Sequence, residues 1–167
     1  MVLVPPERRS QALLPDSVER NLNATVIDRL TRGRFVTSPR KEREHAQQLW
    51  DQLDVRARSL GQDVLTLSGG NQHKVVLARF LALAPRVLLL DEPTRGVDMT
   101  TKTQIYELIR RLAAEGTAVL MVSSELVEVI GLCDRILVLH EGRIAGRFEH
   151  GEADEEELLR VCYGRAA

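Results

Sequence analysis

The chain has 167 residues, of which 44% are hydrophobic, and its formal net charge is −1. This length and composition predict one soluble globular domain with a hydrophobic core, and a charge so near zero disfavours binding to nucleic acid. No apolar run approaches the ~20 residues that a membrane span needs, and Met1–Pro5 is too short for the core of a signal peptide. Cys133 and Cys162 are too few for a disulfide framework or a metal cluster, so we expect both to be reduced.

Residues 8–60 are rich in arginine and lysine and contain few long apolar runs. We predict two helices here, over residues 17–30 and 38–53, with residues 31–35 between them. The alternative is a basic, disordered arm. The spacing of Leu22, Val26 and Leu30 is helical, and it favours a folded segment.

A glycine-containing turn comes next. Ser68-Gly69-Gly70 precedes a predicted helix in which Val76, Phe80 and Leu83 recur at i, i+4 and i+7. A serine at a helix start can cap backbone N–H groups, and glycines let that backbone approach a ligand closely. Because a helix N-terminus attracts anions, the turn is a candidate phosphate contact. On these three residues alone, an ordinary serine-capped helix after a glycine turn is the simpler interpretation.

Val87 to Leu90 is a short apolar run, typical of a strand that is buried on both faces of a parallel sheet. Asp91 and Glu92 follow it, and Pro93 cannot continue the strand. Two carboxylates at the C-terminal end of such a strand lie where α/β sheets bind ligands. A polar strand end before a turn is the alternative interpretation.

The rest of the chain alternates helices and strands. Asp98 can cap a helix that carries Ile105, Leu108, Ile109 and Leu112 on one face, and Gly116 ends it. We then predict a buried strand over 118–122, the segment Ser123-Ser124-Glu125, a short helix through Leu126 and Ile130, and a third strand over 136–139. Glu141-Gly142 gives a turn into residues 143–148, and the acidic residues 149–157 lead into a closing helix. This alternation predicts βαβ units and a parallel sheet, and therefore an α/β fold.

Two of these segments together resemble a known family. Leu67-Ser68-Gly69-Gly70-Asn71-Gln72, followed one helix length later by Val87-Leu88-Leu89-Leu90-Asp91-Glu92-Pro93-Thr94, resembles the signature loop and Walker B strand of ATP-binding-cassette (ABC) ATPases. Residues 93–98 resemble the D-loop that follows Walker B in that family. The order looks like the C-terminal two-thirds of an ABC nucleotide-binding domain, beginning at about the Q-loop. Residues 4–9, 91–98 and 122–126 resemble, more narrowly, the second nucleotide-binding domain of bacterial monosaccharide importers of the ribose, galactose and xylose type.

The resemblance implies a partial P-loop NTPase fold with a parallel sheet core and a helical subdomain. It divides the chain into a helical subdomain with the signature over residues 8–84, a region with Walker B, the D-loop and the switch over 85–150, and a C-terminal acidic helix over 151–167. In the family, each ATP lies between the Walker A loop of one domain and the signature of another. Sugar import would make the protein cytoplasmic and peripheral at the inner face of the cell membrane. Its partners would be a second nucleotide-binding domain and membrane permease subunits.

The resemblance also assigns roles to single residues. The signature residues Leu67, Ser68, Gly69, Gly70, Asn71 and Gln72 would contact ATP held mainly by a partner. Asp91 would position Mg²⁺, Glu92 would polarise the attacking water, and Ser124 would occupy the switch position. Gly96, Val97 and Asp98 would form the D-loop.

Three departures from the family pattern limit this implication. No G-x-x-x-x-G-K-[ST] occurs in the sequence, since Lys74 and Lys102 lack the preceding glycines. Pro5 or Pro6 stands where a Q-loop glutamine would be, and Ser124 stands where many ABC ATPases have histidine. Ser124 can donate a hydrogen bond, but it cannot act as a tautomeric proton partner.

We therefore do not expect the chain to hydrolyse ATP alone. An incomplete sheet also predicts exposed strand edges that favour homo-oligomers. The alternative function is a truncated or split-gene product, either a non-catalytic remnant or an interaction module. A cytosolic ABC protein of translation or DNA repair is less favoured, because such proteins generally carry two complete cassettes or long coiled-coil insertions.

Overall fold

A computed structural model describes residues 1–5, 13–32 and 36–164. The chain divides into two compact units, Met1–Leu120 and Met121–Ala167. The first unit contains a three-stranded sheet and most of the helices, whereas the second contains a hairpin and two short helices. Within the described residues, no helix is both long enough and apolar enough to cross a membrane.

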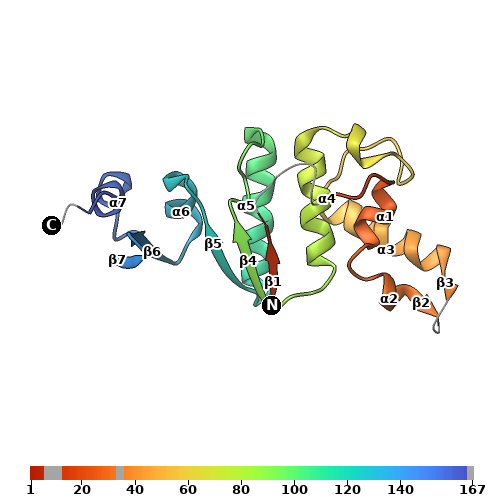
Figure 1. Ribbon diagram of the computed structural model, residues 1–167, viewed down its shortest axis with the longest axis horizontal. Helices are drawn as coiled ribbons and strands as arrows, with labels where there is room; N and C mark the ends of the chain where they lie inside the picture. The colour runs from red at the N-terminus through yellow and green to blue at the C-terminus, as the bar shows by residue number, and fades with distance from the viewer. Residues whose placement is uncertain (6–12, 33–35, 165–167) are drawn as a thin grey trace. The chain divides into compact units, whose positions relative to one another are not determined.

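The sheet of the first unit has the strand order β1-β4-β5 (Figure 1). Strand β1 (Val2–Val4) runs parallel to β4 (Val87–Asp91), with Val2 opposite Leu88 and Val4 opposite Leu90. Strand β5 (Ala118–Val122) lies on the other side of β4. The predicted parallel sheet is therefore confirmed by β1 and β4, although a strand at Val2–Val4 was not predicted. More than eighty residues of chain lie between the two strands.

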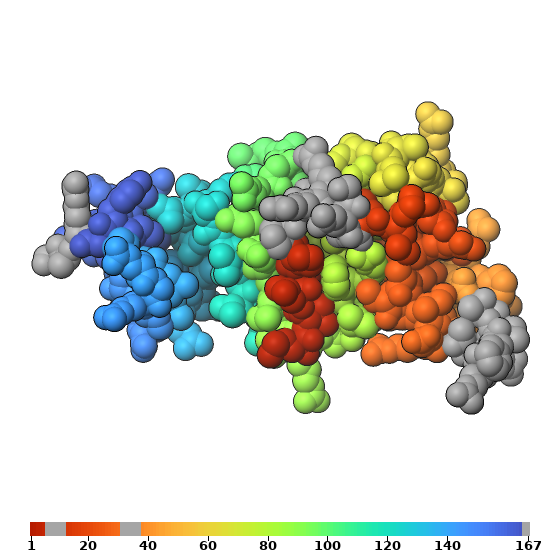
Figure 2. Space-filling model, in the orientation of Figure 1, coloured from red at the N-terminus to blue at the C-terminus, as the bar shows by residue number. Residues whose placement is uncertain are grey.

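The predicted burial of these strands is wrong. Leu88 and Leu90 of β4 are buried, but Val87 and Leu89 between them are only half-buried. In β5, Leu120 is 59% exposed. Strand β1 also lies at the surface in Figure 2. Within the described residues, the strands are therefore buried on one face only. A continuous apolar run cannot distinguish a strand buried on one face from a strand buried on both.

Helix α4 (Gly69–Leu81) forms the centre of the first unit. It packs against β1 and against two other helices, α1 (Val18–Asn23) and α3 (Pro39–Gln52), as Figure 1 shows. Residues 73–78 are buried consecutively, so the helix is covered around most of its circumference. The predicted helix is confirmed, but the predicted apolar face is only partly right, because Phe80 is half-buried and Leu83 lies beyond the helix end.

The single helix predicted over 17–30 is in fact two helices, α1 and α2 (Ile27–Leu30), separated by a turn. Two side chains hold the turn. The Thr25 hydroxyl donates to the Arg79 carbonyl of α4, and Asn23 Nδ2 donates to the Glu42 carbonyl of α3 at 2.9 Å. These tertiary hydrogen bonds outweigh a helical periodicity that extends through the turn.

The remaining elements before α4 are short, except α3. Strands β2 (Thr31–Arg32) and β3 (Val36–Thr37) pair antiparallel. The sequence predicts only a connection over residues 31–35, and residues 33–35 lie outside the described residues. Helix α3 confirms the helix predicted over 38–53 and starts at Pro39, where a missing N–H costs nothing. A 3₁₀ turn, η1 (Val64–Thr66), leads to the signature segment.

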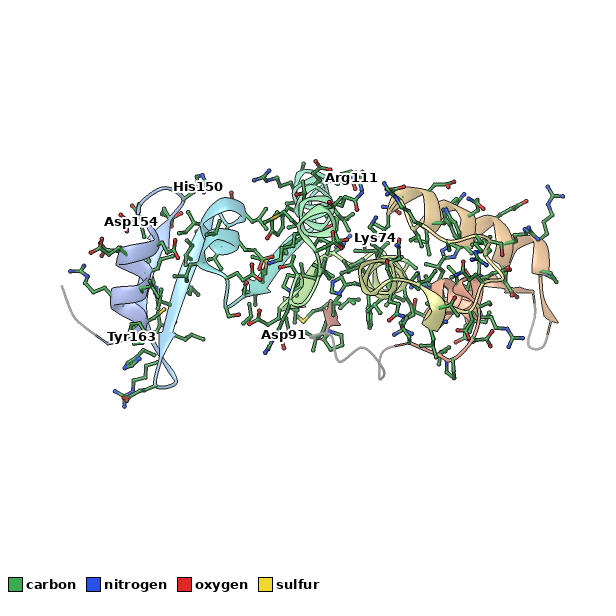
Figure 3. All side chains as sticks on the ribbon, turned by 90° about the horizontal axis from the view of Figure 1, so that it is seen from above. Lys74, Asp91, Arg111, His150, Asp154 and Tyr163 are labelled. Atoms are coloured by element: carbon green, nitrogen blue, oxygen red, sulfur yellow. The ribbon has the colours of Figure 1, made fainter. Side chains whose placement is uncertain are left out.

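After β4, helix α5 (Met99–Ala114) begins at the predicted cap Asp98, and Gly116 follows it with a positive φ of 93°. The second unit contains α6 (Leu126–Leu132), β6 (Arg135–His140), β7 (Arg143–Glu149) and α7 (Glu155–Cys162). Asp154 and Tyr163 mark the two ends of α7 in Figure 3.

The third predicted strand is confirmed as β6, but it does not join the parallel sheet. Among the described residues β6 pairs with β7, and the pairing is antiparallel. Glu141 and Gly142 in the predicted turn both have positive φ, 46° and 75°, which is the conformation of a two-residue hairpin turn. A turn of two residues can only join antiparallel neighbours, because parallel strands need a long crossover.

We predict that Leu158 in α7 holds the second unit together. Its side chain is 1% exposed and packs with Ile136, Val138 and Ala153, so Leu158→Ala should destabilise the unit by about 2–5 kcal/mol. The neighbouring Leu159, 40% exposed, provides the control, and Leu159→Ala should cost less than about 1 kcal/mol. Amide hydrogen exchange in β6, measured at increasing urea concentration, gives the loss of unfolding free energy in both variants. Equal losses in the two variants would contradict the assignment of this core.

Candidate functional site

The signature segment lies at the N-terminus of α4. Ser68 is the N-cap residue and is exposed, but its side chain does not accept a hydrogen bond from the helix backbone. Its Oγ instead accepts a hydrogen bond from Asn71 Nδ2 at 2.9 Å. The predicted serine cap is therefore wrong. The Ser68 hydroxyl is hydrogen-bonded to the side-chain amide of Asn71 and does not cap the first backbone N–H groups of α4.

Asn71 and Gln72 fix the loops that precede α4. The amide N–H of Arg56 donates to Asn71 Oδ1 at 2.7 Å. Gln72 Nε2 donates to the carbonyls of Leu65 and Leu67 at 3.2 and 3.1 Å. Both side chains thus hold backbone groups of the same chain, and Leu67 itself is buried. Of the signature residues, Ser68 is exposed, and Gly69, Asn71 and Gln72 are half-exposed.

Gly70 is buried against the start of α5. A Cβ at this position would lie 2.5 Å from Thr101 Oγ1 and 3.2 Å from Asp98 Oδ2. Real Cβ atoms essentially never approach another atom to less than 3.0 Å. We expected both glycines to let the backbone approach a ligand. For Gly70 the structure gives another reason for the missing side chain, because its space is used by α5, and contact with a ligand stays a prediction.

The D-loop ends in a firmly capped helix. The Thr101 amide donates to Asp98 Oδ1 at 3.0 Å, and the Thr101 hydroxyl donates to Asp98 Oδ2 at 2.8 Å. The predicted Asp98 cap is therefore confirmed. The hydrogen bond from the Thr101 amide is the main reason why the pKa of Asp98 is lowered, and the Thr101 hydroxyl adds to it.

The two Walker B carboxylates follow one another at the C-terminal end of β4. Asp91 is the last residue of the strand, as Figure 3 shows, and is half-buried. Glu92 has a positive φ of 50°, and its carbonyl accepts from the Arg95 amide at 3.2 Å. A non-glycine residue in this conformation is uncommon and costs energy, and such residues cluster at functional sites. Behind it Pro93 and Thr94 are buried, so this turn has a rigid base.

The switch segment belongs to the second unit. Ser124 is exposed, and the preceding Ser123 makes the hydrogen bonds that fix the segment. Its hydroxyl donates to the buried carboxylate of Glu128 and accepts from the Glu125 amide. The sequence interpretation chose Ser124 and missed Ser123 and Glu128. A serine three residues before the start of a helix that carries an acid in its first turn could have indicated them.

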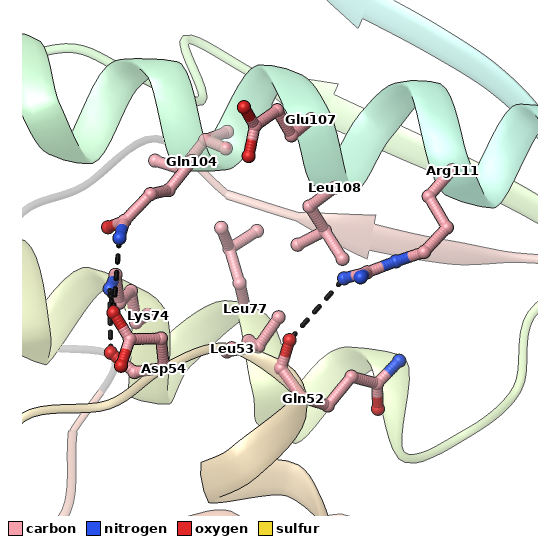
Figure 4. Close-up of a pocket in the computed structure, with 10 residues that line it drawn as sticks. Gln52, Leu53, Asp54, Lys74, Leu77, Gln104, Glu107, Leu108 and Arg111 are labelled. Atoms are coloured by element: carbon pink, nitrogen blue, oxygen red, sulfur yellow. Dashed lines mark hydrogen bonds and ion pairs between the residues drawn. The ribbon is translucent and has the colours of Figure 1, made fainter.

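A cavity of about 150 Å³ in the first unit was not predicted either (Figure 4). It is lined by Gln52, Leu53, Asp54, Lys74, Leu77, Gln104, Ile105, Glu107, Leu108 and Arg111. Lys74 is buried and donates to the Asp54 carbonyl at 2.7 Å, while Gln104 Nε2 donates to Asp54 Oδ2 at 3.1 Å. Burial is the main cause that lowers the pKa of Lys74. These bonds join the loop after α3 to both α4 and α5.

Comparison with known proteins decides the family. Residues 5–95, more than half of the chain, match the family described as ABC transporter. The chain belongs to the ABC transporter family. It is 51% identical over 162 residues to the ribose import ATP-binding protein RbsA 2 of Rubrobacter xylanophilus, covering 96% of this chain and 31% of that protein. It is 43% identical over 166 residues to the arabinose import ATP-binding protein AraG of Pseudomonas savastanoi pv. phaseolicola, covering 99% and 33%. The chain thus spans about a third of the length of these relatives.

Solved structures confirm the fold. The ATP-binding cassette MJ0796, in a dimeric post-hydrolysis state bound to ADP and Pi, matches with a TM-score of 0.72 and 24% identity over 88% of this chain and 62% of that one. The cassette MJ1267 of an ABC transporter matches with a TM-score of 0.72 and 23% identity, covering 96% of this chain and 64% of that one. The chain therefore has the fold of part of an ABC ATPase cassette.

The cap at Asp98 predicts a pH dependence of stability. Because the folded state lowers the pKa of Asp98, its contribution is complete above the ordinary carboxyl pKa of about 4 and is lost as the pH falls through the folded pKa. Asn is as good a capping residue as Asp but does not titrate. Asp98→Asn should therefore weaken the loss of stability at acidic pH.

The measurement is the thermal unfolding midpoint of both proteins as a function of pH below neutrality. Asp154→Asn at the N-terminus of α7 is a matched control in the second unit, because Asp154 also accepts a hydrogen bond from a backbone amide. Identical acid profiles for Asp98→Asn and the wild type would show that this cap does not contribute through its charge.

Proposed function

We propose that this chain is the signature- and Walker B-bearing part of the ATP-binding subunit of an ABC-type sugar importer. The observation that carries the proposal is the exposed turn at the N-terminus of α4. Ser68 is exposed there and leaves the helix backbone uncapped, and Asn71 and Gln72 make hydrogen bonds that hold the turn in shape. Such a turn suits contact with a phosphate group, because the helix dipole and free N–H groups favour an anion.

ATP would be bound jointly. The groups that hold the β- and γ-phosphates would belong to a second nucleotide-binding domain, as the similarity to ABC ATPases implies. Leu67 to Gln72 would then form the opposite wall of the nucleotide site, with Ser68 as its most exposed residue and Leu67 and Gly70 buried beneath. The similarity to relatives named for ribose and arabinose import supports a monosaccharide as the transported class.

The residues at the end of β4 fit a magnesium nucleotide. Among the described residues no three His, Cys, Asp or Glu side chains come together as a metal site, so Asp91 would contribute a single carboxylate. Mg²⁺ commonly binds in this way, with one or two carboxylates plus waters and phosphate oxygens. When bound, the ion would neutralise charge on the transferring phosphoryl group. Glu92 would accept a proton from the attacking water, and Ser124 would donate a hydrogen bond only.

The proposal also includes two kinds of partner, membrane permease subunits and further copies of this chain. A subunit of this kind would lie in the cytoplasm against permease subunits in the membrane, with the helical subdomain of residues 8–84 as the contact. The three-part division of the chain stays a prediction. Homo-oligomers are also proposed, since Leu120, Val122, Leu137 and Leu139 are exposed strand residues.

Opposite effects of two substitutions test the proposal. In a mixture of this chain with a Walker A-bearing domain of the same transporter, Ser68→Arg should abolish ATP-dependent association, because the long side chain occupies the place of the phosphate. Glu92→Gln should keep or strengthen association and reduce phosphate release by about 100-fold or more, because the amide cannot accept a proton.

Ser59→Arg and Glu115→Gln, at exposed positions outside the motifs, are the matched controls. Sedimentation measures association, and a coupled assay measures phosphate release. Normal association of Ser68→Arg would instead favour the non-catalytic remnant or interaction module. Equal loss of both readouts in both variants would indicate a general folding defect.

A further inference from the structure

Helices α4 and α5 meet within the first turn of each helix. Thr101 is 7% exposed and fills the space that Gly70 leaves open, since a Cβ at Gly70 would lie 2.5 Å from Thr101 Oγ1 and 3.3 Å from Thr101 Cγ2. This close approach joins the helix that begins at the signature to the helix that begins after the D-loop.

A cavity lies farther along the same two helices. The cavity of about 150 Å³ lies between Lys74 and Leu77 on α4 and the segment from Gln104 to Arg111 on α5, as Figure 4 shows. Asp54 bridges the gap there through hydrogen bonds from Lys74 and Gln104. At Gly70 and Thr101 the two helices are in packed contact, and a packed contact transmits displacement better than a cavity does.

A continuous series of short contacts leads from Thr101 back to the Walker B carboxylate. Thr101 holds both carboxylate oxygens of Asp98, at 3.0 and 2.8 Å. One turn earlier, the Val97 amide donates to the Thr94 carbonyl at 3.3 Å, and the Arg95 amide donates to the Glu92 carbonyl at 3.2 Å. Thr94 is 1% exposed, so this turn cannot move freely.

We propose that Thr101 is a positioning residue that couples the signature turn to the D-loop and, through it, to Glu92. The inference rests on the proposed function, because it concerns how contact with a nucleotide at Ser68 and Gly69 reaches the chain's own catalytic carboxylate. A displacement of the first turn of α4 pushes Gly70 against Thr101. Thr101 then moves the Asp98 carboxylate, and the backbone between Glu92 and Asp98 follows. Coupling of this kind needs a contiguous packed path, which these residues provide.

The first test uses the 167-residue chain alone and needs no nucleotide. Gly70→Ala adds the methyl group that clashes with Thr101, so it should shift the amide NMR signals of Arg95 and Val97 in the D-loop. The double variant Gly70→Ala/Thr101→Ala removes both clashing Thr101 atoms and should return those signals toward their positions in Thr101→Ala. Gly131→Ala is the matched control, because a Cβ at Gly131 meets nothing within 4 Å. Unshifted D-loop signals in a folded Gly70→Ala variant would overturn the proposal.

The second test adds no bulk and applies even if Gly70→Ala does not fold. Thr101→Val keeps the shape of the side chain but loses the hydroxyl that bonds to Asp98. In the presence of ATP, the affinity of this variant for the Walker A-bearing domain should stay within about twofold of the wild-type affinity. Its rate of phosphate release should be about tenfold lower. Thr101→Ser, which keeps the hydroxyl, should restore most of the rate. Thr103→Val on the same helix is the control, because the exposed Thr103 hydroxyl bonds only within α5, to the Met99 carbonyl.

The outcomes separate this inference from the proposed function. If the wild type associates and releases phosphate but Thr101→Val behaves like Thr103→Val, the coupling is wrong and the function stands. If association and release fall together with the melting temperature, Thr101 has only a structural role and the coupling is again wrong. If the wild type shows no ATP-dependent association, the proposed function fails and the coupling fails with it, whatever the D-loop signals show.

Discussion

The arrangement of the site depends on one steric constraint, the absence of a side chain at Gly70. Gly70 lacks a Cβ, and Thr101 of α5 places its side chain against the backbone of α4 in the space that a Cβ would take. This contact fixes the start of α4 relative to the start of α5. The exposed signature turn precedes α4, and the Asp91-Glu92 turn and the D-loop precede α5. Both motifs are therefore held by a single packed junction in the same unit.

Around this junction, polar side chains bond to the backbone of other segments. Asn71 and Gln72 hold the preceding loops, Lys74 holds the loop after α3, and Asn23 and Thr25 hold the turn between α1 and α2. Buried backbone groups outside regular structure need such partners, because an unpaired polar group costs about 1–3 kcal/mol. Asn71 and Gln72, which the resemblance assigns to ATP contact, thus hold irregular backbone of the same chain in place. Ser68 is the signature residue that stays exposed.

The sequence allowed correct predictions where local chemistry decides the structure. The cap at Asp98, the helix end at Gly116 and the turn at Glu141-Gly142 each depend on a few neighbouring residues, and all three are confirmed. The predictions failed where distant segments decide. The Thr25 hydrogen bond to α4 and the Asn23 hydrogen bond to α3 hold a turn that interrupts a helix. The cap expected at Ser68 fails for a local reason, because the Ser68 hydroxyl bonds to Asn71. The role of Gly70 could not be predicted, because a glycine that faces a ligand and a glycine that faces a helix look alike in sequence.

The central claim is that the N-terminus of α4 is one wall of a nucleotide site completed by another domain. Amide hydrogen exchange of residues 68–72 tests it most directly, measured with Mg-ATP alone, with the Walker A-bearing domain alone, and with both. The account predicts that strong protection at Gly69 requires ATP and the partner together. Equal protection by ATP alone, or none with both present, would contradict it.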